Sequence, residues 1–259
     1  IFAQSENTQK AETNKASEPP PQGKSESKDG SIESEGKNKF NAFSNLPTPE
    51  GDGKTEYDKS KIDIVEGTVV TKDSVSKRIP KFIYARIDFL FLERRKRVNG
   101  QVVVNLFHTR APQNVSFFTN LVEGRLPFVD LKTGEKVTRP FYDGTGIHRI
   151  SKGFLIQGGN QKANGTFDPQ VYIQPEISPG LKHDKPGVMS LVKANKGNSP
   201  QFFITLSEAP SLDGKYTIIG QVVKGLDYVQ RIGRLPFHRR TGRPKRKVII
   251  KKVSIQRVY

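Results

Sequence analysis

Residues 146–159 read GIHRISKGFLIQGG, and this segment is the most informative in the chain. It places a His-Arg pair, an aromatic residue after a glycine, and a glutamine before a Gly-Gly turn within fourteen residues. It has no serine nucleophile positioned beside a base, no paired carboxylates and no metal-ligand spacing. Such a site is suited to holding a substrate, because nucleophilic and metal-assisted catalysis need groups that it lacks.

The patterns on both sides of this segment predict a β domain with two short helices. Residues 82–93 alternate apolar and polar side chains, as a half-buried strand does. The dipeptide Asn99-Gly100 favours a tight turn and predicts a β-hairpin. Pro112 suits a helix start and begins an amphipathic helix over 112–123. We expect further strands at 147–157, 186–192, 201–206, 217–223 and 247–256, and a second helix that carries Leu226, Val229 and Ile232 and stops at Gly233. Such a pattern is typical of a β-barrel or a β-sandwich with helical caps.

Composition divides the chain into an acidic-leaning tail and a basic domain. Residues 1–61 are rich in Ser, Glu, Lys, Asn, Gly and Pro, a composition that predicts a disordered linker. Residues 62–80 form a transition segment that adds at most a short strand, and the folded domain is expected over 81–259. Residues 1–66 carry 9 lysines and 13 acidic residues, which leaves 34 basic and 13 acidic residues on the rest of the chain. Residues 1–66 therefore carry a charge of −4 and the rest of the chain +21, so the excess of positive charge lies on the part expected to fold.

The absence of cysteine bears on chemistry, and the apolar runs and the first residues bear on location. The chain has no cysteine, which excludes disulfides and thiol catalysis. No apolar run reaches the roughly 18–20 residues that a transmembrane helix needs. The first five residues, IFAQS, read as the end of a signal segment, so we expect a periplasmic or secreted protein, with a cytoplasmic one as the alternative. We expect a monomer.

Three separated motifs carry a resemblance to a known family. They are HRI followed by GFLIQGG (148–159), PGVMS followed by QFFIT (186–190 and 201–205), and LDGKY followed by IGQV (212–216 and 219–222). In this order and with compatible gaps, they resemble the cyclophilin peptidyl-prolyl isomerases over about residues 81–257. The resemblance implies a mainly β fold: a closed eight-stranded antiparallel barrel capped by two short α-helices, here behind a disordered N-terminal extension.

The resemblance also implies a site, which is a groove on the outer face of the barrel. Arg149 matches the catalytic arginine, and Gln157 matches a glutamine that anchors the substrate and positions Arg149. The remaining matches are substrate-binding positions, namely His148, Phe154, Leu155, Ala194, Gln201, Phe203, Leu212 and Tyr216. We expect the His148 ring to be hydrogen-bonded to backbone, as a structural residue rather than a base.

The residue types suit the chemistry of this family. The barrier to rotation of an Xaa-Pro bond is about 18–20 kcal/mol because the amide C–N bond has partial double-bond character. Conjugation is lost in the twisted transition state, so the prolyl nitrogen becomes a better hydrogen-bond acceptor. A donor aimed at this nitrogen favours the transition state over both planar ground states. Arg149 can be that donor, because a guanidinium stays charged and carries several N–H groups. No metal or cofactor is needed, and the partners are proline-containing polypeptides.

Some positions depart from the family pattern. The residue before His148 is Ile147, where the family commonly has Phe. The loop between Ala194 and Gln201 is shorter by one residue. Ser211 stands where many eukaryotic members have Trp, and Tyr216 stands where many have His. The change at Ser211 puts tight binding of the immunosuppressant cyclosporin in doubt, but neither change removes the catalytic arginine.

The C-terminal region supplies a competing hypothesis. Residues 231–257 carry eleven Lys and Arg residues and no acidic residue. They are interpreted either as a solvated loop and edge strand or as a weak contact for an anionic surface. Nucleic acid is not expected, because only Phe237 and Tyr259 supply nearby aromatic rings. The alternative function is therefore a catalytically weak cyclophilin-fold module that docks a protein or an anionic partner through the groove or the basic surface.

Overall fold

The alternating residues of 82–93 form the first strand of the barrel. A computed structural model describes residues 79–259. In it, the inward-facing side chains Ala85, Ile87, Phe89 and Phe91 of the first strand are at most 1% exposed. The elements follow in the order β1 (Phe82–Glu93), β2 (Lys96–Leu106), α1 (Pro112–Val122), β3 (Phe128–Val129), β4 (Lys136–Val137), β5 (Gly146–Ser151), β6 (Leu155–Asn160), β7 (Val188–Ala194), β8 (Gly197–Thr205), the 3₁₀ turn η3 (Pro210–Leu212), β9 (Ile218–Lys224), α2 (Leu226–Gly233) and β10 (Val248–Val258).

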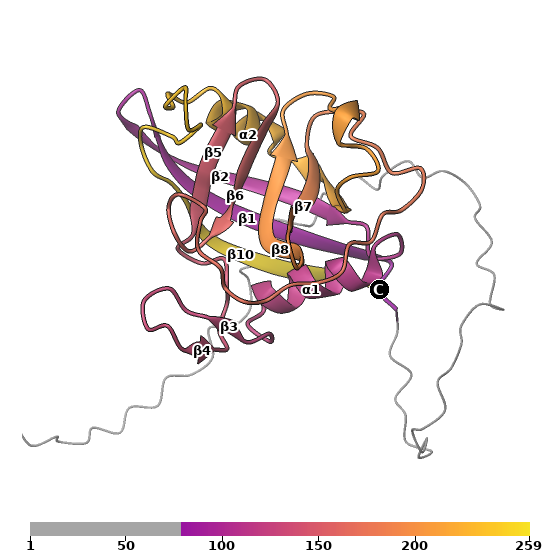
Figure 1. Ribbon diagram of the computed structural model, residues 1–259. Coiled ribbons are helices and arrows are strands. Elements are labelled where there is room, and N and C mark those ends of the chain that lie inside the picture. The colour runs from indigo at the N-terminus through magenta and orange to yellow at the C-terminus, as the bar shows by residue number, and fades with distance from the viewer. Residues whose placement is uncertain (1–78) are drawn as a thin grey trace, which may run out of the picture. The chain divides into compact units, whose positions relative to one another are not determined.

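Eight of these strands close into an antiparallel barrel. Their order around the barrel is β1-β10-β5-β6-β8-β7-β9-β2, while β3 and β4 pair separately. Helices α1 and α2 lie at opposite ends of the barrel strands (Figure 1). Buried apolar side chains from the strands and both helices form one continuous core, so the barrel is filled rather than hollow. The predicted fold class is confirmed for residues 79–259.

The first hairpin is confirmed, but its turn was predicted at the wrong dipeptide. Glu93 pairs with Lys96, so the turn consists of Arg94 and Arg95, both of which have positive φ (45° and 68°). This is the geometry of the tight hairpin turn that Asn-Gly usually occupies. Gly100 instead lies inside β2, where a Cβ atom would come within 2.7 Å of the Tyr228 ring. The glycine is needed there because α2 packs closely on the hairpin.

Other boundaries differ in smaller ways. The run predicted at 147–157 is two strands, β5 and β6, joined by a turn at residues 152–154. The loop before β5 contains the short β3–β4 pair, which no sequence pattern predicted. No helix of residues 79–259 is long and apolar enough to cross a membrane. The predicted linker over 1–61, and almost all of the segment 62–80, lie outside the residues that the structure describes.

Candidate active site

A row of paired residues crosses three neighbouring strands and forms the floor of the site. Arg149 on β5 pairs with Gln157 on β6, and Gln157 pairs with Phe203 on β8. Directly paired residues on neighbouring strands point to the same face of a sheet. The next row, with Ile150, Ile156 and Ile204, is at most 1% exposed and fills the barrel. The row of Arg149, Gln157 and Phe203 therefore lies on the outer face.

The two predicted glutamines form a chain across this face. The side-chain N–H of Gln157 donates to Oε1 of Gln201 over 3.2 Å. The side-chain N–H of Gln201 in turn donates to the carbonyl oxygen of Gly165, also over 3.2 Å. Both amides are thereby fixed in orientation. The Oε1 atom of Gln157 accepts no hydrogen bond from residues 79–259, so it is available to a ligand.

The aromatic part of the site centres on Phe203, which is 3% exposed. Its ring stacks on His183 at a centroid distance of 5.8 Å. The ring of Tyr216 meets Phe203 edge-on at 5.2 Å. Edge-on and offset-stacked rings attract each other beyond simple burial. Phe203 is therefore held from two sides, and the predicted site residue Tyr216 is one of its two ring neighbours.

The polar support below Phe203 was not predicted from the sequence. His183 is fully buried, and its Nδ1 lies 2.9 Å from Oδ1 of Asp213. Its Nε2 lies 2.9 Å from the hydroxyl of Ser190. A hydrogen bond from the His183 backbone N–H is the main reason that the pKa of Asp213 lies below its usual value. Nδ1 is therefore the donor to the carboxylate, and Nε2 accepts from Ser190. Ser190 and Asp213 stand in the quoted motifs, so those motifs were the available signal.

A serine, a histidine and an aspartate bonded in this order are also the parts of a hydrolytic triad. Ser190 is completely buried, and it pairs with Phe203 across β7 and β8. A nucleophilic serine must reach its substrate and needs donors for the oxyanion that forms. Buried Ser190 has no such access. The three residues support the Phe203 ring, and they do not attack a substrate.

The other predicted pocket residues come from four different elements. Phe154 is half-buried in the turn before β6, and its carbonyl oxygen accepts from the Leu206 N–H at 2.8 Å. Leu155 begins β6 and is 6% exposed. Leu212 ends η3, directly before the aspartate that bonds His183. Ala194 ends β7 and pairs with Gly197 at the turn of the β7–β8 hairpin.

His148 differs from the prediction. It is 8% exposed, and a Cβ atom on Gly165 would lie 2.6 Å from the Cδ2 and Nε2 atoms of its ring. The Nδ1 atom lies on the opposite edge of the ring, away from the Gly165 backbone. This buried nitrogen has no partner within residues 79–259, and the expected hydrogen bond between the ring and backbone is absent there. Burial, with a contribution from the neighbouring Arg149 charge, lowers the pKa of His148 to about 4, so the ring is neutral at pH 7.

Arg149 is exposed and lies against a turn of the C-terminal loop. Gly242 approaches so closely that a Cβ atom there would be 3.0 Å from Cγ of Arg149. The carbonyl oxygen of Gly242 accepts from the N–H of Ile150 at 2.7 Å, which fixes this approach. Within residues 79–259 no hydrogen bond or ion pair holds the guanidinium. The stem is thus positioned while the charged end stays free.

This geometry agrees with comparisons with known proteins. The family model described as cyclophilin type peptidyl-prolyl cis-trans isomerase/CLD matches residues 91–255. The chain belongs to this family. It is 37% identical over 164 residues to peptidyl-prolyl cis-trans isomerase B of Streptomyces anulatus, covering 62% of this chain and 94% of that relative. It is 36% identical over 162 residues to peptidyl-prolyl cis-trans isomerase-like 1 of Neurospora crassa, covering 61% of this chain and 90% of the relative.

A solved structure leads to the same family. The crystal structure of a cyclophilin type peptidyl-prolyl cis-trans isomerase from Cryptosporidium parvum matches with a TM-score of 0.55 and 27% sequence identity. The match covers 68% of this chain and 98% of that one. The activity of this cyclophilin is therefore peptidyl-prolyl cis-trans isomerisation.

Proposed function

We propose that Arg149 and Gln157 carry out the isomerisation in the outer-face groove, on proline-containing polypeptides. One observation carries this assignment: the register aligns a free guanidinium, a fixed amide and a supported aromatic ring in one row. In support, a related crystal structure of the Cryptosporidium parvum protein was determined in the presence of the dipeptide Ala-Pro. It matches with a TM-score of 0.52 and 27% identity.

Each residue of the row has a task in the proposed mechanism. Phe203 forms the base of an apolar pocket for the proline ring, walled by Phe154, Leu155 and Leu212. Oε1 of Gln157 accepts from a substrate backbone N–H and fixes the peptide. The guanidinium of Arg149 donates to the prolyl nitrogen once rotation has removed its conjugation. Because the planar ground states offer that nitrogen no free lone pair, this bond stabilises the transition state selectively.

The outer positions are assigned more peripheral tasks. Gln201 orients Gln157 through their hydrogen bond. His148 and Tyr216 border the groove beside Arg149 and Phe203, and the backbone of Ala194 contacts the part of the substrate farther from the proline. A half-buried side-chain amide and aromatic rings replace water around the rotating Xaa-Pro bond. Water stabilises the planar substrate amide more than the twisted one, so the planar state loses part of its stabilisation in the groove.

The test is the cis-to-trans exchange rate of a short neutral Xaa-Pro peptide, measured by NMR exchange spectroscopy. We expect Arg149→Ala to lower kcat/KM by about 100-fold or more, as removal of a transition-state donor does. Arg149→Lys keeps the charge but loses the guanidinium geometry, so its kcat/KM should fall in between. An Arg149→Ala protein that is folded and fully active would contradict the mechanism.

We also propose that the protein assists the folding of other chains. Uncatalysed Xaa-Pro exchange takes tens to hundreds of seconds, which is slow enough to limit folding. The finer version of this proposal is that the protein acts on exported proteins, in the periplasm or outside the cell rather than in the cytoplasm. Fractionation of cells that make the natural protein tests its location. The alternative of a catalytically weak docking module is not favoured by the family to which the chain belongs.

A further inference from the structure

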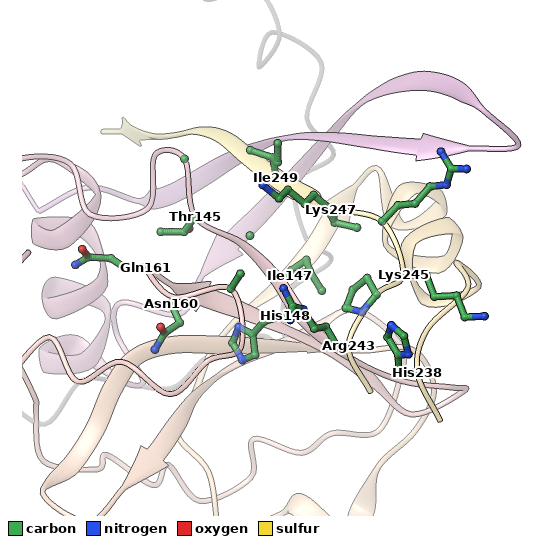
Figure 2. A pocket seen from close by; sticks show the side chains of 16 residues that line it. Thr145, Ile147, His148, Asn160, Gln161, His238, Arg243, Lys245, Lys247 and Ile249 are labelled. Atoms are coloured by element: carbon green, nitrogen blue, oxygen red, sulfur yellow. The ribbon is translucent and has the colours of Figure 1, made fainter. Parts of the chain in front are cut away.

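A cavity of about 500 Å³ opens beside the starts of β5 and β10, next to the proposed groove. Figure 2 shows it from close by: Arg243, Lys245 and His238 lie on one side, and Asn160 and Gln161 lie on the other. The ring of residue 148 also lines it, and this histidine adjoins the catalytic arginine in the chain. A volume of this size is typical of small-ligand sites. The cavity and the groove therefore meet at this histidine.

The charge of the wall has one sign. Four cationic side chains line the cavity, and none of its sixteen lining residues is acidic. None of these four forms an ion pair within residues 79–259, although Arg231 and Arg257, on either side of them in the chain, are paired with Glu93 and Glu123. The described part of the chain therefore leaves their charge uncompensated. The four cations are Arg243, Lys245, Arg246 and Lys247.

The two side-chain amides in the wall are already occupied. Asn160 donates to the carbonyl oxygens of Gly165 and Phe167 and accepts from the Lys162 N–H. Gln161 accepts from a backbone N–H and donates to a carbonyl oxygen in the loop over 129–131. These amides hold the surrounding loops. The groups left for a ligand are therefore the cations and the rings of His148 and His238.

His148 supplies an independent sign of a ligand. The residue is only 8% exposed, and its Nδ1 has no hydrogen-bond partner in residues 79–259. A buried polar atom without a partner is costly and requires an explanation. A neutral imidazole with its proton on Nδ1 donates one hydrogen bond. His148 is one of the residues that line the cavity, so a bound acceptor that reaches Nδ1 would satisfy this atom.

The loop that carries the cations is ordered by its own backbone. The His238 N–H donates to the carbonyl oxygen of Arg243 over 2.9 Å, and the Gly242 N–H donates to that of His238 over 2.8 Å. The Lys245 N–H donates to the Pro236 carbonyl oxygen over 2.8 Å. A rigid loop loses little entropy when a ligand binds. The cationic groups are thus held on a preformed frame.

We propose that this cavity binds an oxyanion of the phosphate class, held by Arg243, Lys245 and Lys247 and by the Nδ1 of His148. Cationic side chains are donors only, and a tetrahedral oxyanion offers acceptors in several directions. The oxyanion has two sources: a free phosphate-bearing small molecule, or a phosphorylated residue of the polypeptide in the adjoining groove. The second source rests on the proposed function, and the first does not.

The concave wall favours a discrete group over a long polyanion. A polyanion bound along the surface would use the outward-facing cations of the whole region equally, and it would not need the buried Nδ1 of His148. A single-stranded nucleic acid would also need stacking rings, and Phe237 is the one aromatic residue in the sequence over 234–247. A discrete oxyanion is therefore the better fit, and a delocalised polyanion is the outcome that would contradict it.

The first experiment titrates the protein with inorganic phosphate against chloride at constant ionic strength. NMR of the imidazole nitrogens reports His148 directly. We expect a saturable shift at millimolar phosphate. The double variant Lys245→Ala/Lys247→Ala should weaken binding by about tenfold or more, because it removes two charge-assisted contacts. The control Lys251→Ala/Lys252→Ala removes the same charge from two exposed β10 lysines outside the cavity and should change binding by less than about twofold.

Two results would overturn the site. One is the absence of a saturable His148 shift. The other is an equal loss of phosphate binding in both double variants, which indicates a delocalised basic surface.

The second experiment separates the two sources. It compares the exchange rate of a neutral Xaa-Pro peptide with that of peptides carrying phosphoserine three residues before or after the proline. A gain in kcat/KM for a phosphopeptide, lost in Lys245→Ala/Lys247→Ala but kept in the control, assigns the site to the polypeptide substrate. Phosphate binding without any such gain assigns it to a free ligand. Turnover of the neutral peptide reports the proposed function separately, so failure of one proposal is distinguishable from failure of the other.

Discussion

The groove and the cavity each contain a buried histidine, and the two histidines are bonded in opposite ways. In the groove, both ring nitrogens of His183 are bonded, to Asp213 and to Ser190. Beside the cavity, the Nδ1 of His148 has no partner in the described part of the chain. The groove therefore satisfies its buried histidine from within the protein, whereas the cavity leaves a buried donor site open.

This difference indicates two kinds of recognition. The groove presents a supported ring, a fixed amide and one free guanidinium, which suits a neutral amide that must rotate. The cavity presents unpaired cations on a fixed loop, which suits a charged group that must stay bound. Arg149 and His148 are neighbours in the chain, yet they belong to these two different environments.

The largest expected effect is on stability, when each of the two histidines is replaced by alanine in turn. His183→Ala leaves the Ser190 hydroxyl buried without its acceptor and opens a space beneath Phe203. We expect a loss of about 3–4 kcal/mol in the free energy of unfolding. His148→Ala breaks no hydrogen bond of Nδ1 within residues 79–259 and should cost about 1 kcal/mol. Urea unfolding of both variants measures the difference.

Turnover tests the role of His183 in a second way. His183→Ala should lower kcat/KM for a neutral peptide by about tenfold, because Phe203 loses the ring on which it stacks. If His183→Ala and His148→Ala lowered the free energy of unfolding equally, hydrogen bonding of the ring within the protein would not be what distinguishes the two regions.

A smaller effect is expected at Gly146, where the regions meet. A Cβ atom there would lie 2.3 Å from the carbonyl oxygen of Val248 on β10. Gly146→Ala should therefore cost about 2–3 kcal/mol of stability, as overpacking against backbone does. Gly144→Ala is the matched control: its Cβ meets nothing within 4 Å, and only its positive φ of 80° is strained, at about 1 kcal/mol. Thermal unfolding that ranks Gly144→Ala as the more damaging change would contradict the close strand approach.

The smallest effect concerns pH. Burial holds the pKa of His148 at about 4 in the folded protein, against an ordinary value of 6.5 in the unfolded chain. Between these values the unfolded chain binds the proton first, so stability is lost as pH falls from about 6.5 towards 4. The contribution lost between pH 8 and pH 5 is roughly 2 kcal/mol. His148→Gln lacks this titration, so its free energy of unfolding should fall less over the same range. Parallel pH profiles of the two proteins would exclude the lowered pKa.

The parts of the fold that local patterns determine were predictable. The alternation over 82–93 and the proline at 112 placed β1 and α1 within about one residue of their observed bounds. The hairpin turn was misplaced because Asn99-Gly100 is the stronger local signal. Gly100 is needed instead for a distant contact with the Tyr228 ring, and no local pattern records that contact.

The candidate site likewise has a part that the sequence predicted and a part that it did not. The motifs predicted the residues of the row formed by Arg149, Gln157 and Phe203, since these motifs lie on barrel strands and the strand register aligns them. The bonding of His183 was not predictable, because its partners Ser190 and Asp213 reach it from different elements. The roles carried over from the family, including those of Ala194 and Leu212, remain predictions.

The barrel closes unevenly. β1 and β2 are joined along eleven residue pairs, but β5 meets β10 at two, Ile147 with Val248 and Gly146 with Ile249. The barrel is therefore a rolled sheet that closes along a short seam between β5 and β10. Amide hydrogens at this seam should exchange with solvent sooner than those of β1. Lys247 and His148 stand on opposite sides of it. A ligand that contacts both residues would hold β5 and β10 together, so occupancy of the cavity would slow the opening of the barrel itself.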